Sequence, residues 1–494
     1  MIKQAACIGG GVIGGGWIAR FILNGWGVNV YDPQPGAQDK VEQVLANARR
    51  SLPALADVPM PKEGKLCYCD SIEQAVTGAS WIQESVPERL ALKHSVFKEL
   101  QRYCKSDAII GSSTSGFTPT QLQQNSDKPE QIFVAHPFNP VYLLPLVEVV
   151  ASAKNIHSRQ LRAQEILKSI GMSPLLVRRE IDAHIADRLL EAVWREALWL
   201  IKDDVATTAE IDDAIRFGFG LRWAQMGLFE TYRIAGGEAG MAHFIAQFGP
   251  ALQWPWTKLM DVPELTDELI EKIATQSDEQ SGAYSIRELE RIRDDNLVGI
   301  MRVQKNYNWG VGKMLKEQDQ KMLADIETDS RTQSHQQPLN MYEGRVLPAW
   351  IDYNGHMNES HYLTVLSNAT DNFMAYIGVD EQYIAQGGSY FTVETHIRHL
   401  DEAKLNAPLT VTTQLLSCDA KRMHLFHRLT CPETGKLLAT GEHMLLHMDL
   451  NCGKTSFASD AVQSCLNDIF EYHSTLEKPE GAGSAIGVKL KAKS

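Results

Sequence analysis

Six glycines stand in the ten-residue stretch CIGGGVIGGG, residues 7–16, close to the start of the chain. The preceding QAACI predicts a short buried strand, and the following VIGGGWIARFILNG predicts a helix that ends at Gly25. Gly9, Gly11 and Gly14 have the spacing G-x-G-x-x-G. The first glycine of that pattern permits a tight turn, the second lets the backbone approach a pyrophosphate, and the third allows close helix–strand packing. The stretch therefore predicts a phosphate-binding turn rather than a flexible linker.

The next predicted strand, VNVYD, tells which dinucleotide the turn binds. The N–H groups of Val12 and Ile13, at the helix N-terminus, face the phosphates in this arrangement. The strand ends at Asp32, where a carboxylate accepts the two ribose hydroxyls and repels a 2′-phosphate. Residues 33–35, Pro-Gln-Pro, supply no arginine for such a phosphate. The sequence predicts NAD rather than NADP as the cofactor.

The pattern of apolar residues changes twice along the 494 residues and predicts a multidomain protein. Residues 1–182 alternate short apolar runs with helical patterns, which is typical of a Rossmann-type α/β domain with a parallel sheet buried on both faces. Residues 183–327 look all-helical and begin with one long amphipathic helix, with Ile185, Leu189, Val193, Ala197 and Ile201 on its apolar face. Thr207 and Glu210 have the spacing of a capping box.

The last third of the chain has another character. Residues 328–338 are polar and predict a linker, and residues 339–474 predict an α+β unit with one helix and an antiparallel sheet. The strand-like runs are SYFTVETHIRHL, PLTVTTQLLSC, RMHLFHRLTC and KLLATGEHMLLHMDL. Residues 475–494 are expected to form a mobile, mildly basic tail.

Composition excludes several classes of protein. A net charge of −13 argues against a nucleic-acid-binding surface, and no run of about 18 apolar residues is present to span a membrane. The eight cysteines are scattered without zinc-site spacing and are expected to be reduced packing residues. The N-terminus lacks the succession of regions found in a signal peptide, so a cytoplasmic location is expected.

Three motifs in the first two units, SSTS, HPFNP and LVEVV, occur in the order found in one enzyme family. Through them, roughly residues 1–320 resemble the 3-hydroxyacyl-CoA dehydrogenases, and more closely those relatives that oxidise small free hydroxy acids. A histidine at a strand end, His136, suits a base that takes a hydroxyl proton. The resemblance assigns that role to His136, with Glu148 holding the imidazole and Ser115 at the substrate hydroxyl. A strand cap for His136 and a turn residue for Ser115 are the structural alternatives.

The same resemblance implies further contacts with cofactor and substrate. It places Glu88, Lys93 and Asn139 along the cofactor, although most lysines are solvated and a surface role for Lys93 stays open. Phe138, beside His136, is a candidate for the substrate pocket. The family carries asparagine before the sequence RLL at the start of the long helix, whereas this chain has Asp187. A carboxylate there disfavours an acyl-CoA substrate, and either faces a cationic substrate or pairs with an arginine.

An aromatic stretch, residues 217–237, falls where this family closes its substrate pocket. Aromatic faces attract quaternary ammonium groups, and Trp223 is the residue we expect to contact the substrate. Helix packing or dimer contacts are equally good interpretations for any single one of these side chains. The aromatic residues concerned are Phe217, Phe219, Trp223, Phe229 and Tyr232.

The third unit carries the sequence IDYNGHMNESHY, residues 351–362. It resembles the signature of hot-dog-fold acyl-CoA thioesterases of the 4-hydroxybenzoyl-CoA type, over roughly residues 340–450. The resemblance places the catalytic carboxylate at Asp352, which attacks the thioester or activates water. His356 and Asn358 are equally well explained by a turn that enters a helix. Many relatives carry a second acid where this chain has Trp350, and Asp-Tyr-Asn-Gly is also a good turn.

A free-acid dehydrogenase joined to a thioesterase resembles the bifunctional enzymes of bacterial carnitine breakdown. That resemblance implies oxidation of L-carnitine to 3-dehydrocarnitine in one unit and hydrolysis of betainyl-CoA to glycine betaine and CoA in the other. One alternative is a dehydrogenase of another hydroxy acid, such as L-gulonate or a 3-hydroxy acid, with the hot-dog unit as an oligomerisation module. A second alternative is a crystallin-like protein that binds NAD without turnover. Both families form oligomers, so a homodimer or larger assembly is expected.

Overall fold

The structure is a computed structural model that describes residues 3–484 except 59, 236–239, 249, 251–256, 258–263, 331–334, 348–349 and 406. The chain forms two compact units. The first comprises Met1–Arg49 and Lys62–Met314, and the second comprises Arg50–Pro61 and Leu315–Ser494. Among the described residues, no helix has the length and apolar character needed to cross a membrane.

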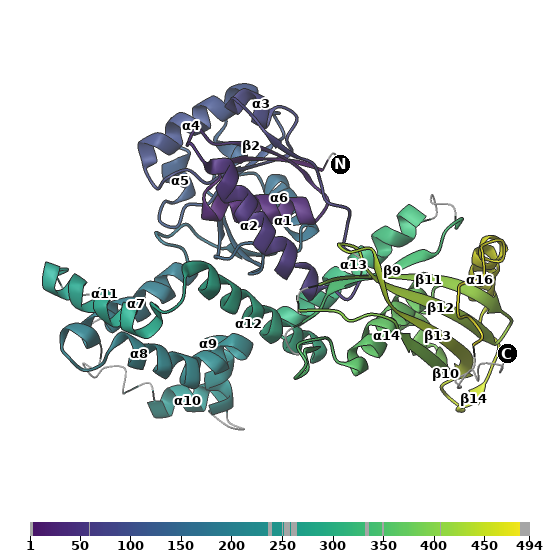
Figure 1. Cartoon of the computed structure of the whole chain (residues 1–494). Coiled ribbons are helices and arrows are strands. Elements are labelled where there is room, and N and C mark those ends of the chain that lie inside the picture. The colour runs from purple at the N-terminus through teal and green to yellow at the C-terminus, as the bar shows by residue number, and fades with distance from the viewer. Residues whose placement is uncertain are drawn as a thin grey trace. The chain divides into compact units, whose positions relative to one another are not determined.

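An eight-stranded sheet with the order β3-β2-β1-β4-β5-β6-β7-β8 forms the centre of the first unit (Figure 1). The predicted strands QAACI and VNVYD are β1 and β2, and β3 lies at one edge of the sheet. The strands are β1 (Gln4–Ile8), β2 (Gly27–Tyr31), β3 (Leu66–Tyr68), β4 (Trp81–Glu84), β5 (Ile109–Ser112), β6 (Ile132–Pro137), β7 (Leu146–Val150) and β8 (Ser173–Val177).

Two expectations about this sheet are wrong. The β6–β7 pair is antiparallel, because only residues 138–145 connect the two strands and a parallel pair requires a longer crossover. The strand β8 is not buried on both faces, since Leu175 and Leu176 are exposed at the sheet edge. The remaining strands have the expected buried, mostly parallel arrangement.

Helices of the first unit pack around the sheet, and the connection between β6 and β7 anchors the helical part to it. Tyr142 donates a hydrogen bond of 2.7 Å to the buried Asp294 on α12. The helices that pack with the sheet are α1 (Val12–Leu23), α2 (Ala37–Ser51), α3 (Ile72–Val76), α4 (Leu90–Tyr103), α5 (Pro119–Leu122) and α6 (His157–Ser169). The helical part contains α7 (Ala186–Lys202), α8 (Thr208–Ala214), α9 (Gly220–Ala235), α10 (Gly240–Phe248), α11 (Asp267–Ser281) and α12 (Ile286–Asn306).

The predicted long amphipathic helix is α7, and the predicted capping box opens α8 through Thr207 and Glu210. The apolar face of α7 is only partly covered. Ile201 is buried, whereas Ile185 and Leu189 have 41% and 58% of their surface exposed. Within a single chain, the apolar face of α7 is therefore exposed over its first turns.

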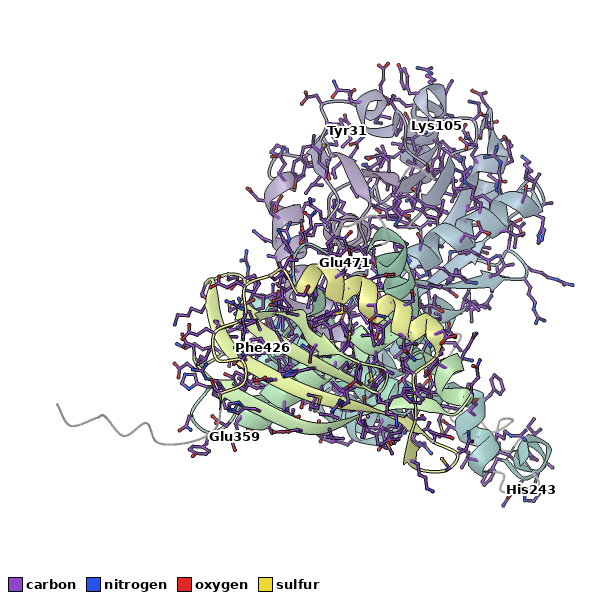
Figure 2. All side chains as sticks on the ribbon, turned by 90° about the vertical axis from the view of Figure 1, so that its right-hand side faces the viewer. Tyr31, Lys105, His243, Glu359, Phe426 and Glu471 are labelled. Carbon is purple, nitrogen blue, oxygen red and sulfur yellow. The ribbon has the colours of Figure 1, made fainter. Side chains whose placement is uncertain are left out.

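The second unit has an antiparallel sheet of order β10-β13-β12-β11-β9, with β14 paired to β13. The helix α14 packs on this sheet through fully buried Val365, Leu366, Ala369 and Phe373. Figure 2 shows α16, on which Glu471 is labelled, against the sheet that carries Phe426. The elements are α13 (Val311–Ser330), β9 (Leu339–Arg345), α14 (Glu359–Tyr376), α15 (Glu381–Ala385), β10 (Gly388–His399), β11 (Pro408–Cys418), β12 (Arg422–Cys431), β13 (Lys436–Asp449), β14 (Lys454–Thr455) and α16 (Asp460–His473).

Both ends of this unit differ from the sequence expectation. The helix α13 runs to Ser330, so helix rather than linker occupies residues 328–330. Residues 475–484 of the predicted mobile tail are ordered, because the N–H of Gly483 donates to both carboxylate oxygens of Glu442 at 2.9 and 3.0 Å. Residues 485–494 lie outside the described residues.

Candidate active sites

The glycine-rich turn between β1 and α1 has the geometry of a phosphate cradle. Gly9 has φ +97°, and its N–H donates to the carbonyl of Tyr31 at 2.9 Å. A side chain at Gly9 would come within 2.6 Å of the carbonyl oxygen of Ser85, and one at Gly14 would overlap the carbonyl of Gly9. By contrast, a Cβ on Gly11 meets no atom within 4 Å. The open space lies at Gly11, where a pyrophosphate approaches in such turns.

Asp32 is joined to this turn by its side chain. One carboxylate oxygen accepts the N–H of Gly10 at 2.6 Å, and the other accepts the N–H of Gln34 at 2.8 Å. Each oxygen retains a lone pair for a ribose hydroxyl. The turn and the acid therefore fit a dinucleotide, with Val12 and Ile13 in the first turn of α1.

Gly14→Ala is expected to weaken NADH binding by about 5–150-fold, because the added methyl group overlaps the turn and overpacking costs about 1–3 kcal/mol. The measurement is a fluorescence titration with NADH. Gly299→Ala is the matched control, since Gly299 lies within α12 with open space around its Cα. An unchanged affinity in Gly14→Ala would show that the turn does not hold the phosphates.

A buried ion-pair network lies at the ends of β4 and β5. Lys93 is buried, and its ammonium group contacts Glu84 at 2.9 Å and Glu88 at 3.2 Å. Burial raises the pKa of Glu88, but the hydrogen bond from Thr114 and the charge of Lys93 outweigh it and hold the pKa below its usual value. Glu88 also accepts the N–H of Gly116 at 3.2 Å. A solvated surface role for Lys93 is thus excluded, and Glu88 is tied to the loop that carries Ser115.

Glu84 belongs to this network and was missed by the sequence analysis. Its carboxylate accepts hydrogen bonds from Lys93 and, at 2.5 Å, from Ser112. An acid within the apolar run SWIQES carries the same signal as Glu148 in LVEVV, since a lone buried carboxylate is costly. The cost of burying an unpaired carboxylate would therefore have been enough to identify Glu84 from the sequence.

His136 and Glu148 face each other across the antiparallel β6–β7 pair. The Nδ1 atom of His136 lies 3.0 Å from Glu148, and its Nε2 atom lies 3.3 Å from the hydroxyl of Ser115. The other oxygen of Glu148 accepts the N–H groups of Ile185 and Ala186, both at 3.0 Å, where α7 begins. These contacts arrange Ser115, His136 and Glu148 as a relay with a carboxylate at its end.

The electrostatic environment keeps Glu148 ionised. Burial raises the pKa of its carboxyl group, but the hydrogen bond from His136 and the N–H groups of Ala186 and Ile185 lower it by more. The net result is a pKa below the usual value. The N-terminus of α7 adds the favourable end of its helix dipole. A carboxylate held in this way orients the imidazole and stabilises its cation when Nε2 takes a proton.

Of three further candidate residues, two lie next to His136 and the third is exposed after the end of β6. Asp187 is half-buried in the first turn of α7, with its carboxylate 3.6 Å from Nε2 of His136. Phe138 packs edge-on against the His136 ring at 4.8 Å between centroids. Asn139 is exposed just after the end of β6. Asp187 and Phe138 therefore adjoin the base itself.

Described rings of the aromatic stretch pack against one another and against Phe244. Trp223 packs on Phe219 at 4.5 Å, and Tyr232 stacks on Phe244 at 4.6 Å. Phe217 and Phe229 are 75% and 70% exposed, so the described residues do not enclose them. The contacts of this stretch support its packing interpretation within one chain.

The loop before α14 holds Asp352. Its carboxylate accepts the N–H of Asn354 at 2.8 Å, and its carbonyl accepts the N–H of Gly355, which has φ +79°. Asn358 caps α14 by accepting the N–H of Ser360 at 3.0 Å. Asn358 thus serves as the N-cap of α14, in agreement with the turn interpretation. One carboxylate oxygen of Asp352 accepts the hydrogen bond that closes the short turn to Asn354.

The neighbours of Asp352 are held by the segment 399–404. The Nε2 atom of His356 lies 3.1 Å from a carboxylate oxygen of Glu402. Trp350, which stands where many relatives carry a second acid, is buried and stacks on His361 of α14 at 5.3 Å. Trp350 therefore leaves Asp352 without an acid two positions before it, while Glu359 lies in the first turn of α14.

Comparisons with known proteins assign the two candidate sites to segments of the chain that match different families. Residues 4–181 match the 3-hydroxyacyl-CoA dehydrogenase NAD binding domain, residues 184–285 match the C-terminal domain of that family, and residues 346–466 match the thioesterase-like superfamily. A solved NAD+-dependent 5-formyl-3-hydroxy-2-methylpyridine 4-carboxylic acid 5-dehydrogenase is similar to this chain at 27% identity, with a TM-score of 0.53, over 61% of this chain and 98% of that one. The Rossmann-type, helical and hot-dog fold classes and the NAD cofactor are thereby confirmed.

The relatives named for both activities extend over the whole chain. An L-carnitine dehydrogenase/betainyl-CoA thioesterase of Ruegeria pomeroyi is 60% identical over 98% of this chain and 99% of its own length. One of Agrobacterium fabrum is 56% identical over 99% of both chains. An L-carnitine dehydrogenase of Mesorhizobium japonicum is 56% identical over 66% of this chain and 91% of its own length. The chain therefore belongs to the L-carnitine dehydrogenase/betainyl-CoA thioesterase family, in which 3-hydroxyacyl-CoA dehydrogenase domains are joined to a thioesterase-like domain.

Proposed function

We propose that this protein oxidises L-carnitine to 3-dehydrocarnitine with NAD and that its C-terminal unit hydrolyses betainyl-CoA to glycine betaine and CoA. The observation that carries the first activity is the His136 imidazole, placed between Glu148 and Ser115. The names of relatives that match the whole chain support both substrates. We assign the dehydrogenase to residues 1–182 and 183–327 and the thioesterase to residues 339–474.

The dehydrogenase step needs a proton acceptor and a hydride acceptor. NAD, when bound, supplies the second of these. Ser115 binds the substrate hydroxyl, and Nε2 of His136 takes its proton while the hydride leaves the same carbon. The imidazolium that forms keeps its Nδ1–H on Glu148, which is anchored by the first N–H groups of α7. Glu88, Lys93 and Asn139 are assigned to the cofactor side of the site.

Asp187 is assigned to the trimethylammonium group. In carnitine the cationic nitrogen is separated by one methylene from the carbon that bears the hydroxyl. A carboxylate 3.6 Å from Nε2 of His136 therefore lies within reach of that cation when the hydroxyl is on the base. Phe138, whose ring packs against His136, is assigned to an apolar face of the same pocket.

The thioesterase step is assigned to Asp352, as the nucleophile on the thioester carbonyl or as the base for the attacking water. The backbone N–H groups at the start of α14 polarise the thioester oxygen.

The test of the proposed function uses the full-length chain, because Arg50–Pro61 belongs to the second compact unit. NADH formation is followed with L-carnitine, L-gulonate and 3-hydroxybutyrate, and CoA release is followed with betainyl-CoA. We expect turnover with L-carnitine and betainyl-CoA. Strong turnover of gulonate alone would overturn the first assignment, and no release of CoA would favour the oligomerisation module.

We also propose a cytoplasmic homodimer. Leu189, Leu190 and Trp194 of α7 are each more than half exposed, as is Val393 of β10. Exposed apolar groups of this number favour burial against a second copy. All eight cysteines are free, which suits a reducing compartment. Light scattering coupled to size-exclusion chromatography is expected to give the mass of a dimer or a larger oligomer, and a monomer would refute this proposal.

A further inference from the structure

His184 is a fully buried histidine that the mechanism above does not use. It lies between β8 and α7, with φ +51°, and the preceding Ala183 has φ +58°. Two consecutive residues other than glycine in the left-handed region are costly, at about 1 kcal/mol or more each. Such a conformation persists only where surrounding contacts enforce it, so the contacts of this short segment identify what it does.

The first set of contacts holds the loop that carries Ser115. The Nε2 atom of His184 lies 3.4 Å from the carbonyl oxygen of Thr114, and the N–H of Ala183 donates to the carbonyl of Gly116 at 3.3 Å. A carbonyl oxygen only accepts, so Nε2 carries the proton and Nδ1 carries the lone pair. The segment thus binds the residue on each side of Ser115.

The second set of contacts reaches the other two members of the relay. The His184 ring lies 5.6 Å from the His136 ring, with 51° between the ring planes. The next two residues, Ile185 and Ala186, donate their N–H groups to Glu148. Residues 183–186 therefore touch His136, Glu148 and the backbone around Ser115 at once.

The charge state of His184 suits a neighbour of a base. Burial lowers its pKa, and the nearby His136 lowers it further, against weaker opposing effects of the Thr114 carbonyl, Glu148 and Asp187. The pKa of His184 accordingly lies below its usual value, and its ring is neutral at neutral pH. His136 can then accept a proton without repulsion from a second imidazolium.

We propose that His184 is a positioning residue of the dehydrogenase site: its Nε2–H bond to Thr114 and its ring beside His136 keep the Ser115 hydroxyl and His136 Nε2 converged on the substrate hydroxyl. This inference rests on the proposed relay of Ser115, His136 and Glu148. It does not depend on which hydroxy acid is the substrate.

Two substitutions separate positioning from packing. His184→Gln places an amide N–H near the position of Nε2 and retains the donor to Thr114. His184→Asn tolerates the left-handed backbone, but its shorter side chain does not reach that carbonyl. Each is measured in the full-length chain for kcat and KM with the hydroxy acid that the wild type oxidises, for NADH affinity, and for CoA release by the other unit.

We expect His184→Asn to lower kcat by about 10–100-fold, because small displacements of reacting groups have effects of that size. NADH affinity and CoA release are expected to stay within about twofold of the wild type, and His184→Gln is expected to recover most of kcat. Equal loss in both variants, wild-type kcat in His184→Asn, or loss of NADH binding in either variant would overturn the proposal. Failure of the wild type to oxidise L-carnitine would overturn the proposed substrate only.

Discussion

Replacing His136 by glutamine is expected to lower kcat for hydroxy-acid oxidation by about 10³-fold, with NADH affinity unchanged. Glutamine fills a similar volume but has no group that takes a proton at neutral pH, and general-base catalysis contributes about 10²–10⁴-fold. The Nε2 atom of His136 lies 3.3 Å from Ser115, and its Nδ1 atom is held by Glu148. The measurements are initial rates of NADH formation and a fluorescence titration with NADH.

A histidine outside the site provides the control. His157 is exposed at the start of α6, and His157→Gln is expected to match the wild type in every assay. The release of CoA from betainyl-CoA should be the same in both variants, because Asp352 is assigned to that step. If His136→Gln retained more than about a tenth of the wild-type kcat, another group would be the base.

Replacing Asp352 by asparagine is expected to lower betainyl-CoA hydrolysis by about 10²–10³-fold and to leave the dehydrogenase unchanged. Asparagine neither attacks a thioester nor activates water as a carboxylate does. Its side-chain oxygen still accepts the N–H of Asn354, which the Asp352 carboxylate accepts at 2.8 Å, so the turn before α14 is retained. CoA release is followed with a thiol reagent, and NADH formation is followed in parallel.

A second aspartate controls for the loss of a negative charge. Asp460 is exposed at the first position of α16, and Asp460→Asn is expected to hydrolyse betainyl-CoA at the wild-type rate. A wild-type rate in Asp352→Asn as well would remove Asp352 from the chemistry. If the wild type released no CoA, the hot-dog unit would serve assembly instead.

The candidate site was predictable from sequence wherever neighbours along the chain set the geometry. The turn of Gly9, Gly11 and Gly14 lies between a strand and a helix that the pattern of apolar residues predicts. The position of Asp32 at the end of the next strand follows from the usual length of a strand–helix–strand unit. Glu148 was assigned through the family resemblance, and the cost of an unpaired carboxylate within an apolar strand favoured that assignment. Its partner in the fold is His136, directly opposite on β6.

Predictions were weaker where burial depends on distant segments. The resemblance placed Lys93 along the cofactor but left a surface role open, and only the fold brings Glu84, at the end of β4, against its ammonium group. The short strand β3 was missed because Leu66–Tyr68 is too brief to show a period. The strand β8 was predicted to be buried because its residues are apolar. It is the last strand of the sheet, and there Leu175 and Leu176 are exposed.

The sequence alone thus predicted the cofactor turn, NAD as the cofactor, the three kinds of domain and the residues proposed to carry the chemistry. Their chemistry depends on residue type and short-range spacing, which a helix or strand converts directly into position. Only the tertiary structure showed that His184 lies beside His136 and that Trp350 stacks on His361. It also showed that an N–H group at the start of α7 donates to the Glu148 carboxylate. These contacts join segments far apart in sequence or depend on an unusual backbone conformation, so no local pattern of residues specifies them.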